Sequence, residues 1–152
     1  MRPDRTPLLD RYRTGIRAVL DALADIADIE LDRPAPDGGW TAREIAHHLA
    51  ESETNGFVRL RRLIAEDEPL IAPYDQDEYA RRNHYGRPIG SSLAVLDAVR
   101  ASSLELLAAL TPAEWARSGQ RTDSGRYSVD DWLSVYAQHP HDHAGQIRRS
   151  RG

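Results

Sequence analysis

Two short stretches of this chain concentrate its histidines. His139, His141 and His143 lie within five positions, and His47 is followed directly by His48. Imidazole nitrogens are strong ligands for zinc, nickel and iron, and residues four apart on a helix lie one turn apart on the same face. Catalytic metal sites usually keep three protein ligands and one open position. We therefore hypothesise a three-histidine site made by the pair His139 and His143 and completed by His48.

The residues alone leave a structural alternative open for each part of this site. A lone histidine such as His48 is more often an ordinary residue at the edge of a core than a ligand. The spacing of His139 and His143 also arises by chance. Pro140 lies between them, removes the hydrogen bond to the Tyr136 carbonyl and tends to kink a helix. The sequence therefore supports a metal site and a purely structural reading about equally.

The composition indicates one globular domain covering residues 1–152, with 40% hydrophobic and 29% charged residues. The net charge of −4 comes without a clustered basic face, so nucleic acid is not an expected partner. No apolar run of about eighteen residues and no signal-peptide h-region is visible, so we expect a cytoplasmic protein without a membrane span. Cysteine is absent. Any thiol chemistry would need a small molecule to supply the sulfur.

Apolar periodicity and capping residues predict four main helices, hence an all-α fold. Thr6 is the expected cap of the first helix, which should reach Asp28. Thr41 and Glu44 form a capping box for the second helix, which should end near Ala65. The third and fourth helices are expected to open at residues 91–92 and at Ser128. The long polar connection over residues 69–90 should hold a short helix at 75–82, and residues 118–126 read as a loop or small hairpin.

Helical geometry places the histidines differently on these helices. His48 lies on the flank of the apolar stripe and can face a bundle interior, whereas His47 lies almost opposite that stripe. His139 and His143 share one edge of the last helix, and His141 should point into solvent. An antiparallel four-helix bundle with up-down-up-down order is expected. In that order the second and last helices run in the same direction, and the ligands would meet only if the last helix began about two turns before the second helix along the bundle axis.

Two residues that follow His48 on its side of the second helix are candidates for a substrate pocket. Asn55 and Arg59 could line it and contact an anionic group, or they could form a solvated flank of the helix. Tyr136 could belong to the core, or its hydroxyl could support a ligand.

The histidine stretches and their surroundings resemble the DinB-like superfamily. The resemblance is carried by WTAREIAHHLAE at residues 40–51 and YAQHPHDHAGQI at residues 136–147, and by connecting segments at residues 69–75 and 123–128. It is closest to the YfiT-like branch, described as bacillithiol transferases and as metal-dependent hydrolases. This chain departs from the branch's pattern at Pro140.

The resemblance implies a four-helix bundle that binds one divalent metal ion, nickel or zinc, through His48, His139 and His143, and it suggests a homodimer. The neutral imidazoles would leave the metal charge uncompensated, so a bound thiol or water would become acidic. The first expected activity is transfer of a low-molecular-weight thiol, of bacillithiol or mycothiol type, to an electrophilic small molecule. The alternatives are hydrolysis of an amide or ester by hydroxide activated at the metal, and a metal-binding stress protein without turnover.

Overall fold

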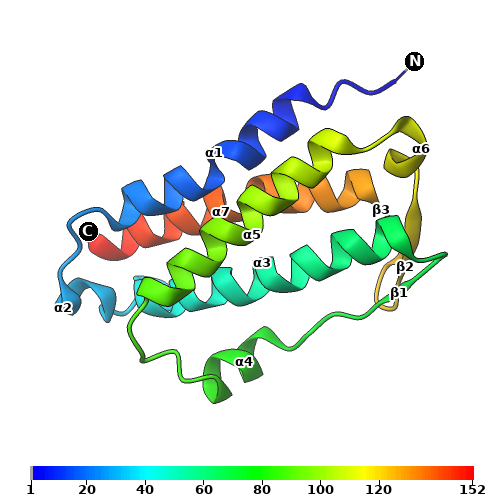
Figure 1. Cartoon of the computed structure of the whole chain (residues 1–152). Helices are drawn as coiled ribbons and strands as arrows, with labels where there is room; N and C mark the ends of the chain where they lie inside the picture. Colours follow the sequence, from blue (N-terminus) through cyan, green and yellow to red (C-terminus); the bar gives the residue numbers. More distant parts are fainter. Residues whose placement is uncertain (1) are drawn as a thin grey trace.

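Four long helices pack along their lengths in the computed structural model, which describes residues 2–152 (Figure 1). They are α1 (Thr6–Leu23), α3 (Ala42–Ala65), α5 (Gly90–Ala109) and α7 (Val129–Arg151). Three short helices lie in the connections, α2 (Asp28–Leu31), α4 (Gln76–Arg82) and α6 (Pro112–Trp115), with the strands β1 (Leu70–Ile71), β2 (Ser118–Arg121) and β3 (Gly125–Ser128). The predicted four-helix bundle is confirmed. None of these helices is both long enough and apolar enough to cross a bilayer.

The order of helix directions differs from the up-down-up-down prediction, which was wrong. α1 and α7 run in one direction and α3 and α5 in the other (Figure 1). The hydrogen bond from Trp132 to the Gly56 carbonyl joins the start of α7 to the second half of α3, as antiparallel helices require. The long connection after α3 returns the chain to the end of the bundle where α3 began. The early turns of α3 and the later turns of α7 therefore lie at one level without any stagger.

Capping residues fix where the functional helices begin. Thr41 Oγ1 accepts a hydrogen bond from the Glu44 backbone N–H at 3.2 Å, and the Glu44 carboxylate accepts one from the Thr41 backbone N–H at 3.1 Å. Ser128 and Asp131 form the same reciprocal pair at the start of α7. Both predicted helix starts are confirmed, and they set the register of the histidines.

The first helix is shorter than predicted. It ends at Leu23 rather than Asp28, because Asp25 adopts a positive φ of 55° that no helix can continue. The expected cap at Thr6 is also wrong: Thr6 is the first helical residue, and its N–H donates to the Asp4 carboxylate instead.

The connections contain a small sheet that makes the fold less purely helical than predicted. β2 and β3 form the hairpin that the sequence allowed, and β1 adds to β2 in parallel. The expected short helix is α4, whose N-terminus is capped by Asp75. The hairpin leads directly into α7 and places Tyr127 beside that helix.

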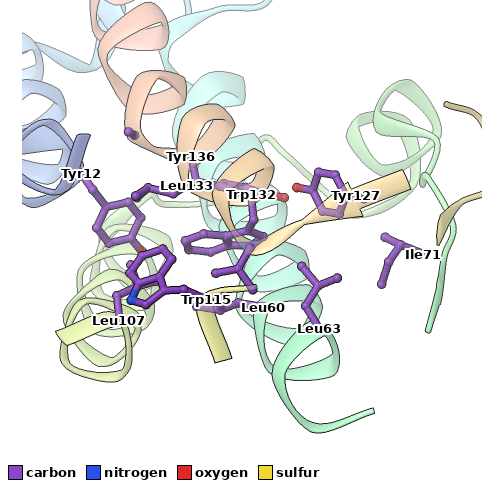
Figure 2. Packing of buried hydrophobic residues seen from close by; sticks show 12 residues of the cluster. Tyr12, Leu60, Leu63, Ile71, Leu107, Trp115, Tyr127, Trp132, Leu133 and Tyr136 are labelled. Atoms are coloured by element: carbon purple, nitrogen blue, oxygen red, sulfur yellow. The ribbon is translucent and has the colours of Figure 1, made fainter. Parts of the chain in front are cut away.

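Two hydrophobic clusters fill the bundle on either side of its middle. One gathers aromatic side chains around Trp132 (Figure 2), and the other lies where α3 begins and α7 ends. Trp132 is 1% exposed, and its indole N–H donates to the Gly56 carbonyl at 2.8 Å. The histidines of α7 lie between the residues that this helix gives to the two clusters, and His48 lies between Ile45 and Leu49 of the second cluster, so apolar packing holds both helices in place beside the histidines.

Candidate metal centre

The three predicted ligands converge where the early part of α3 faces the later part of α7. The Nε2 atom of His139 lies 3.4 Å from that of His48 and 3.1 Å from that of His143. One ligand atom from each ring lies within 4.8 Å of the other two. His48 and His139 are 91 residues apart in the chain. The bundle thus brings together the histidines that the sequence singled out.

The two separations from His139 fit a divalent metal ion. Nitrogen ligands 2.0–2.1 Å from a tetrahedral centre lie about 3.3 Å apart, which the two Nε2 distances from His139 bracket. His143 Nδ1 lies 2.7 Å from the side-chain oxygen of Gln146. An amide oxygen accepts, so Nδ1 of His143 carries the proton and Nε2 keeps its lone pair for a metal.

Burial keeps two of the imidazoles neutral. It lowers the pKa of His48 to about 3, with smaller contributions from His143 and His139. Burial and then the neighbouring His139 lower the pKa of His143 to about 4. Neutral rings with converging lone pairs repel one another, and a cation between them removes that repulsion. The donor set therefore favours a metal ion over protons at neutral pH.

A buried ion pair compensates for the proline between the ligands. Pro140 lies inside a continuous α7 and cannot donate to the Tyr136 carbonyl. Arg100 from α5 supplies the missing donor at 3.1 Å, and it also contacts the Tyr12 carbonyl at 2.6 Å and Glu53 at 2.5 Å. Glu53 Oε1 in turn lies 3.8 Å from His139 Nδ1. This network explains how His139 keeps a ligand geometry beside a proline.

Sequence reasoning missed this network, although part of its signal was present. Pro140 implies that the Tyr136 carbonyl lacks its helical donor, and Gly15 of α1 lies against the Pro140 ring. A Cβ on Gly15 would lie 2.4 Å from the Pro140 ring and 2.7 Å from the Arg100 guanidinium. Nothing in the sequence indicated which of its many arginines would reach that carbonyl.

The other two histidines of these stretches are structural, but neither is placed as predicted. His47 is 0% exposed, because α5 and the connection before it cover the side of α3 that faces away from α7. Its ring contacts Ser92 at 2.7 Å and the Arg87 carbonyl at 2.9 Å. His141 does not point freely into solvent. Its Nε2 lies 2.9 Å from the Arg11 carbonyl, so it ties α7 to α1.

Two cavities flank the histidine cluster and share Tyr74 and Gln76 in their walls. The larger one, about 660 Å³, includes His143, with Trp40 and Arg149 among its other lining residues. The smaller one, about 170 Å³, is lined by His139 and by arginine and tyrosine side chains. Trp40 also packs on His48, with ring centroids 4.5 Å apart. Small molecules can therefore approach the cluster from two directions.

The two predicted pocket residues are separated by the structure. Arg59 lines the smaller cavity together with His139. Asn55 does not reach either cavity at the histidine cluster. It lines a different hollow between α3, α4 and α5, and its amide donates to the Glu51 carbonyl at 2.8 Å. The predicted pocket role of Asn55 is corrected accordingly, because α3 presents it toward α4 rather than toward α7.

The fold and the cluster define a four-helix bundle with a candidate metal site built from facing helices. The DinB superfamily matches residues 11–147, so the chain belongs to this superfamily. A relative from Oceanobacillus iheyensis, named "Putative metal-dependent hydrolase", is 34% identical over 86% of this chain and 76% of its own length. The structure of YfiT from Bacillus subtilis, described as a probable metal-dependent hydrolase with an unusual four-helix bundle topology, matches with a TM-score of 0.89 and 26% identity over 99% of this chain and 91% of that one.

A more distant structure shares the fold alone. The mycothiol-dependent maleylpyruvate isomerase matches with a TM-score of 0.77 at 13% identity, over 95% of this chain and 61% of that one. The family and the four-helix bundle implied by the histidine stretches are therefore confirmed. The relatives are named for metal dependence, and this chain has a histidine cluster that fits a metal ion.

Proposed function

We propose that this protein is a metal-dependent transferase that joins a low-molecular-weight thiol to an electrophilic small molecule at the three-histidine centre. The observation that carries the proposal is the position of His48, His139 and His143 between two cavities with a common wall. A reaction between two substrates needs room for both beside one metal ion. The larger cavity would hold the thiol and the smaller one part of the electrophile.

When bound, a divalent zinc or nickel ion held by three neutral imidazoles supplies Lewis acidity that favours the thiolate form of a thiol. The protein's own residues would orient both substrates. Arg149 and Gln146 offer polar groups to the thiol in the larger cavity. In the reaction the thiolate sulfur forms a bond to the electrophilic carbon, the leaving group departs with the electron pair of its bond, and the thiol proton goes to solvent.

Among the described residues, 2–152, no general base stands out beside the histidine cluster, and this favours thiol transfer over hydrolysis. The carboxylates lining the larger cavity are Asp37, Asp75 and Asp77, all on exposed positions of loops or of α4. Glu53 lies nearer to the cluster, but Arg100 holds it in a buried ion pair. Hydrolysis at a single metal ion usually uses a carboxylate close to the attacking water, whereas a thiol at a metal is already deprotonated.

Hydrolysis of an amide or ester is the second candidate function, because the relatives are named metal-dependent hydrolases. Both reactions would use the same metal ligands. They differ in whether a thiol is consumed.

The test compares the two reactions in protein loaded with zinc or nickel. We expect conjugation of bacillithiol or mycothiol to monochlorobimane, with release of chloride, and no hydrolysis of 4-nitrophenyl acetate above the rate of free metal. His143→Ala should abolish conjugation. His141→Gln is the matched control on the same helix and should keep it. Ester hydrolysis without thiol consumption would favour the second candidate, and conjugation that survives His143→Ala would contradict the proposal.

A further inference from the structure

The smaller cavity beside the metal centre is lined mainly by groups that donate hydrogen bonds. Arg59 from α3 and Arg121 from β2 line it together with three tyrosines, Tyr74, Tyr127 and Tyr136. These residues come from α3, the connection before α4, β2, β3 and α7, and they meet next to His139. At about 170 Å³ the cavity has room for a small polar group rather than for a whole cofactor.

The wall of the smaller cavity includes a partly buried cation, Arg59. Its guanidinium contacts the Tyr136 hydroxyl at 3.4 Å and the Ala72 carbonyl at 2.9 Å, and within residues 2–152 it forms no ion pair. Arg121 differs, because its Nε and Nη2 atoms bind the Asp123 carboxylate, both at 2.9 Å. Of the two arginines in the cavity wall, Arg121 is therefore neutralised by Asp123, whereas Arg59 carries a positive charge that no carboxylate among the described residues neutralises.

The buried phenols of the cavity wall add unused hydrogen-bonding capacity. Tyr127 is 5% exposed, and its hydroxyl, directed toward α7 (Figure 2), has no hydrogen-bond partner in the part of the chain that the structure describes. The Tyr74 hydroxyl is unpartnered in the same way. A buried hydroxyl without a partner costs free energy, so a bound acceptor would stabilise this arrangement.

The phenols remain protonated at neutral pH and so can act as donors. Burial raises the pKa of Tyr136 and of Tyr74 to about 12, and burial also raises the pKa of Tyr127. The positive charges of Arg59 and Arg121 lower the pKa of Tyr127 and so partly offset the effect of burial. Within the described residues the Tyr127 hydroxyl has no hydrogen-bond partner, so both arginines act on it through their charge. Two guanidiniums and several neutral phenols together form a set of donors that an anion accepts.

We propose that this cavity is a subsite for one anionic group, a carboxylate, sulfonate or phosphate, on the substrate that reacts at the three-histidine centre. Arg59 supplies the charge and a charge-assisted hydrogen bond, Tyr127 and Tyr74 supply neutral hydrogen bonds, and Arg121 adds the N–H groups that Asp123 does not accept. Naming the occupant as part of the electrophile rests on the proposed function. The affinity of the cavity for an anion does not.

The direct test uses inorganic sulfate and nuclear magnetic resonance, with sodium chloride at matched ionic strength as the reference. We expect a saturable shift of the Arg59 side-chain Nε–H signal, both in the metal-loaded protein and in His143→Ala, which excludes binding to the metal. Arg59→Gln, followed through the Tyr127 backbone amide, should weaken sulfate binding at least about tenfold, as loss of a charged hydrogen bond implies.

Two further variants make the result specific. Tyr127→Phe should weaken sulfate binding about fivefold, the effect of one neutral hydrogen bond. Arg148→Gln removes an exposed arginine of α7 and should leave binding unchanged. A response to sulfate that does not saturate, or an equal loss in Arg148→Gln and Arg59→Gln, would overturn the subsite. Melting curves of each variant confirm that it is folded.

A pair of electrophiles separates this proposal from the proposed function. Iodoacetate and iodoacetamide present the same reacting carbon and the same iodide leaving group, but only the first carries a carboxylate. We expect the enzyme to favour iodoacetate beyond the uncatalysed preference, and Arg59→Gln to remove that preference by raising KM. Equal use of both reagents without sulfate binding would overturn the subsite and keep the proposed function. Saturable sulfate binding without any turnover would support the subsite and count against the proposed function.

Discussion

Replacing Arg100 with methionine, alone and together with Pro140→Ala, measures how far this guanidinium substitutes for the N–H that Pro140 lacks. Arg100 is 3% exposed and contacts the Tyr136 carbonyl at 3.1 Å. In Pro140→Ala a backbone N–H becomes available to the same carbonyl through the regular helical hydrogen bond. The two changes therefore act on one acceptor, and their effects should not add.

The size of each effect follows from the contacts. Arg100→Met leaves the Glu53 carboxylate, 2% exposed, without its partner, and breaking a buried ion pair costs about 3–5 kcal/mol. That cost persists when residue 140 is alanine. The Tyr136 carbonyl, however, then keeps a donor, so the loss from Arg100→Met should be smaller by about 1 kcal/mol, the net value of one hydrogen bond.

The assay is urea denaturation, in the presence of a chelator, of the parent protein, the two single variants and the double variant. The unfolding midpoints are compared using one shared dependence of the free energy on urea concentration. Arg61→Met is the matched control, because its guanidinium binds the hydroxyls of Ser102 and Ser103 and does not touch the Tyr136 carbonyl. Its effect should be the same with proline or alanine at 140. A cycle for Arg100 that is additive within error would refute the compensation.

Two further predictions concern pH and packing. In metal-free protein the pKa values of His48 and His143 are depressed, so the unfolded chain binds protons first as pH falls. Their contribution to stability is complete above pH 6.5 and is lost as pH falls toward about 4 for His143 and about 3 for His48. Between pH 7 and pH 5 the free energy of unfolding should drop by about 2 kcal/mol for each imidazole. Urea midpoints at the two pH values check this. If the free energy of His143→Ala dropped as much as that of the parent protein, the prediction would be contradicted. Gly56→Ala would place a Cβ 2.5 Å from the Tyr136 ring and should cost about 1–3 kcal/mol in a thermal melt. Gly86→Ala meets no atom within 4 Å and should melt like the parent protein, and equal melting of both variants would refute the close packing.

Local sequence signals predicted those parts of the fold that depend on neighbouring residues. The capping boxes at Thr41 and Ser128 involve residues three apart, so they fixed the starts of α3 and α7 and the faces on which their histidines lie. The periodic apolar stripes likewise identified helices that became the bundle. The convergence of His48 with the α7 pair followed from these local features once the helices were packed.

The direction of the helices and the surroundings of the histidines depend on contacts between distant residues. The long connection after α3 could either turn back at once or traverse the bundle, and no local pattern distinguishes these paths. The apolar pattern of α3 predicts that His47 faces away from the bundle. α5 nevertheless covers it, because α3 has neighbouring helices on two sides. The Arg100 and Glu53 network also joins separate helices, and an arginine carries no local mark of such a role.

Elemental analysis of metal bound to purified histidine variants tests the metal centre most directly. The parent protein should contain one zinc or nickel ion per chain. His48→Ala, His139→Ala and His143→Ala should each lose it while remaining folded by circular dichroism, since each removes one of three convergent imidazoles. His141→Gln should retain it, because that ring contacts α1. Equal metal content in all four variants, or a parent protein that binds no divalent metal, would contradict the account.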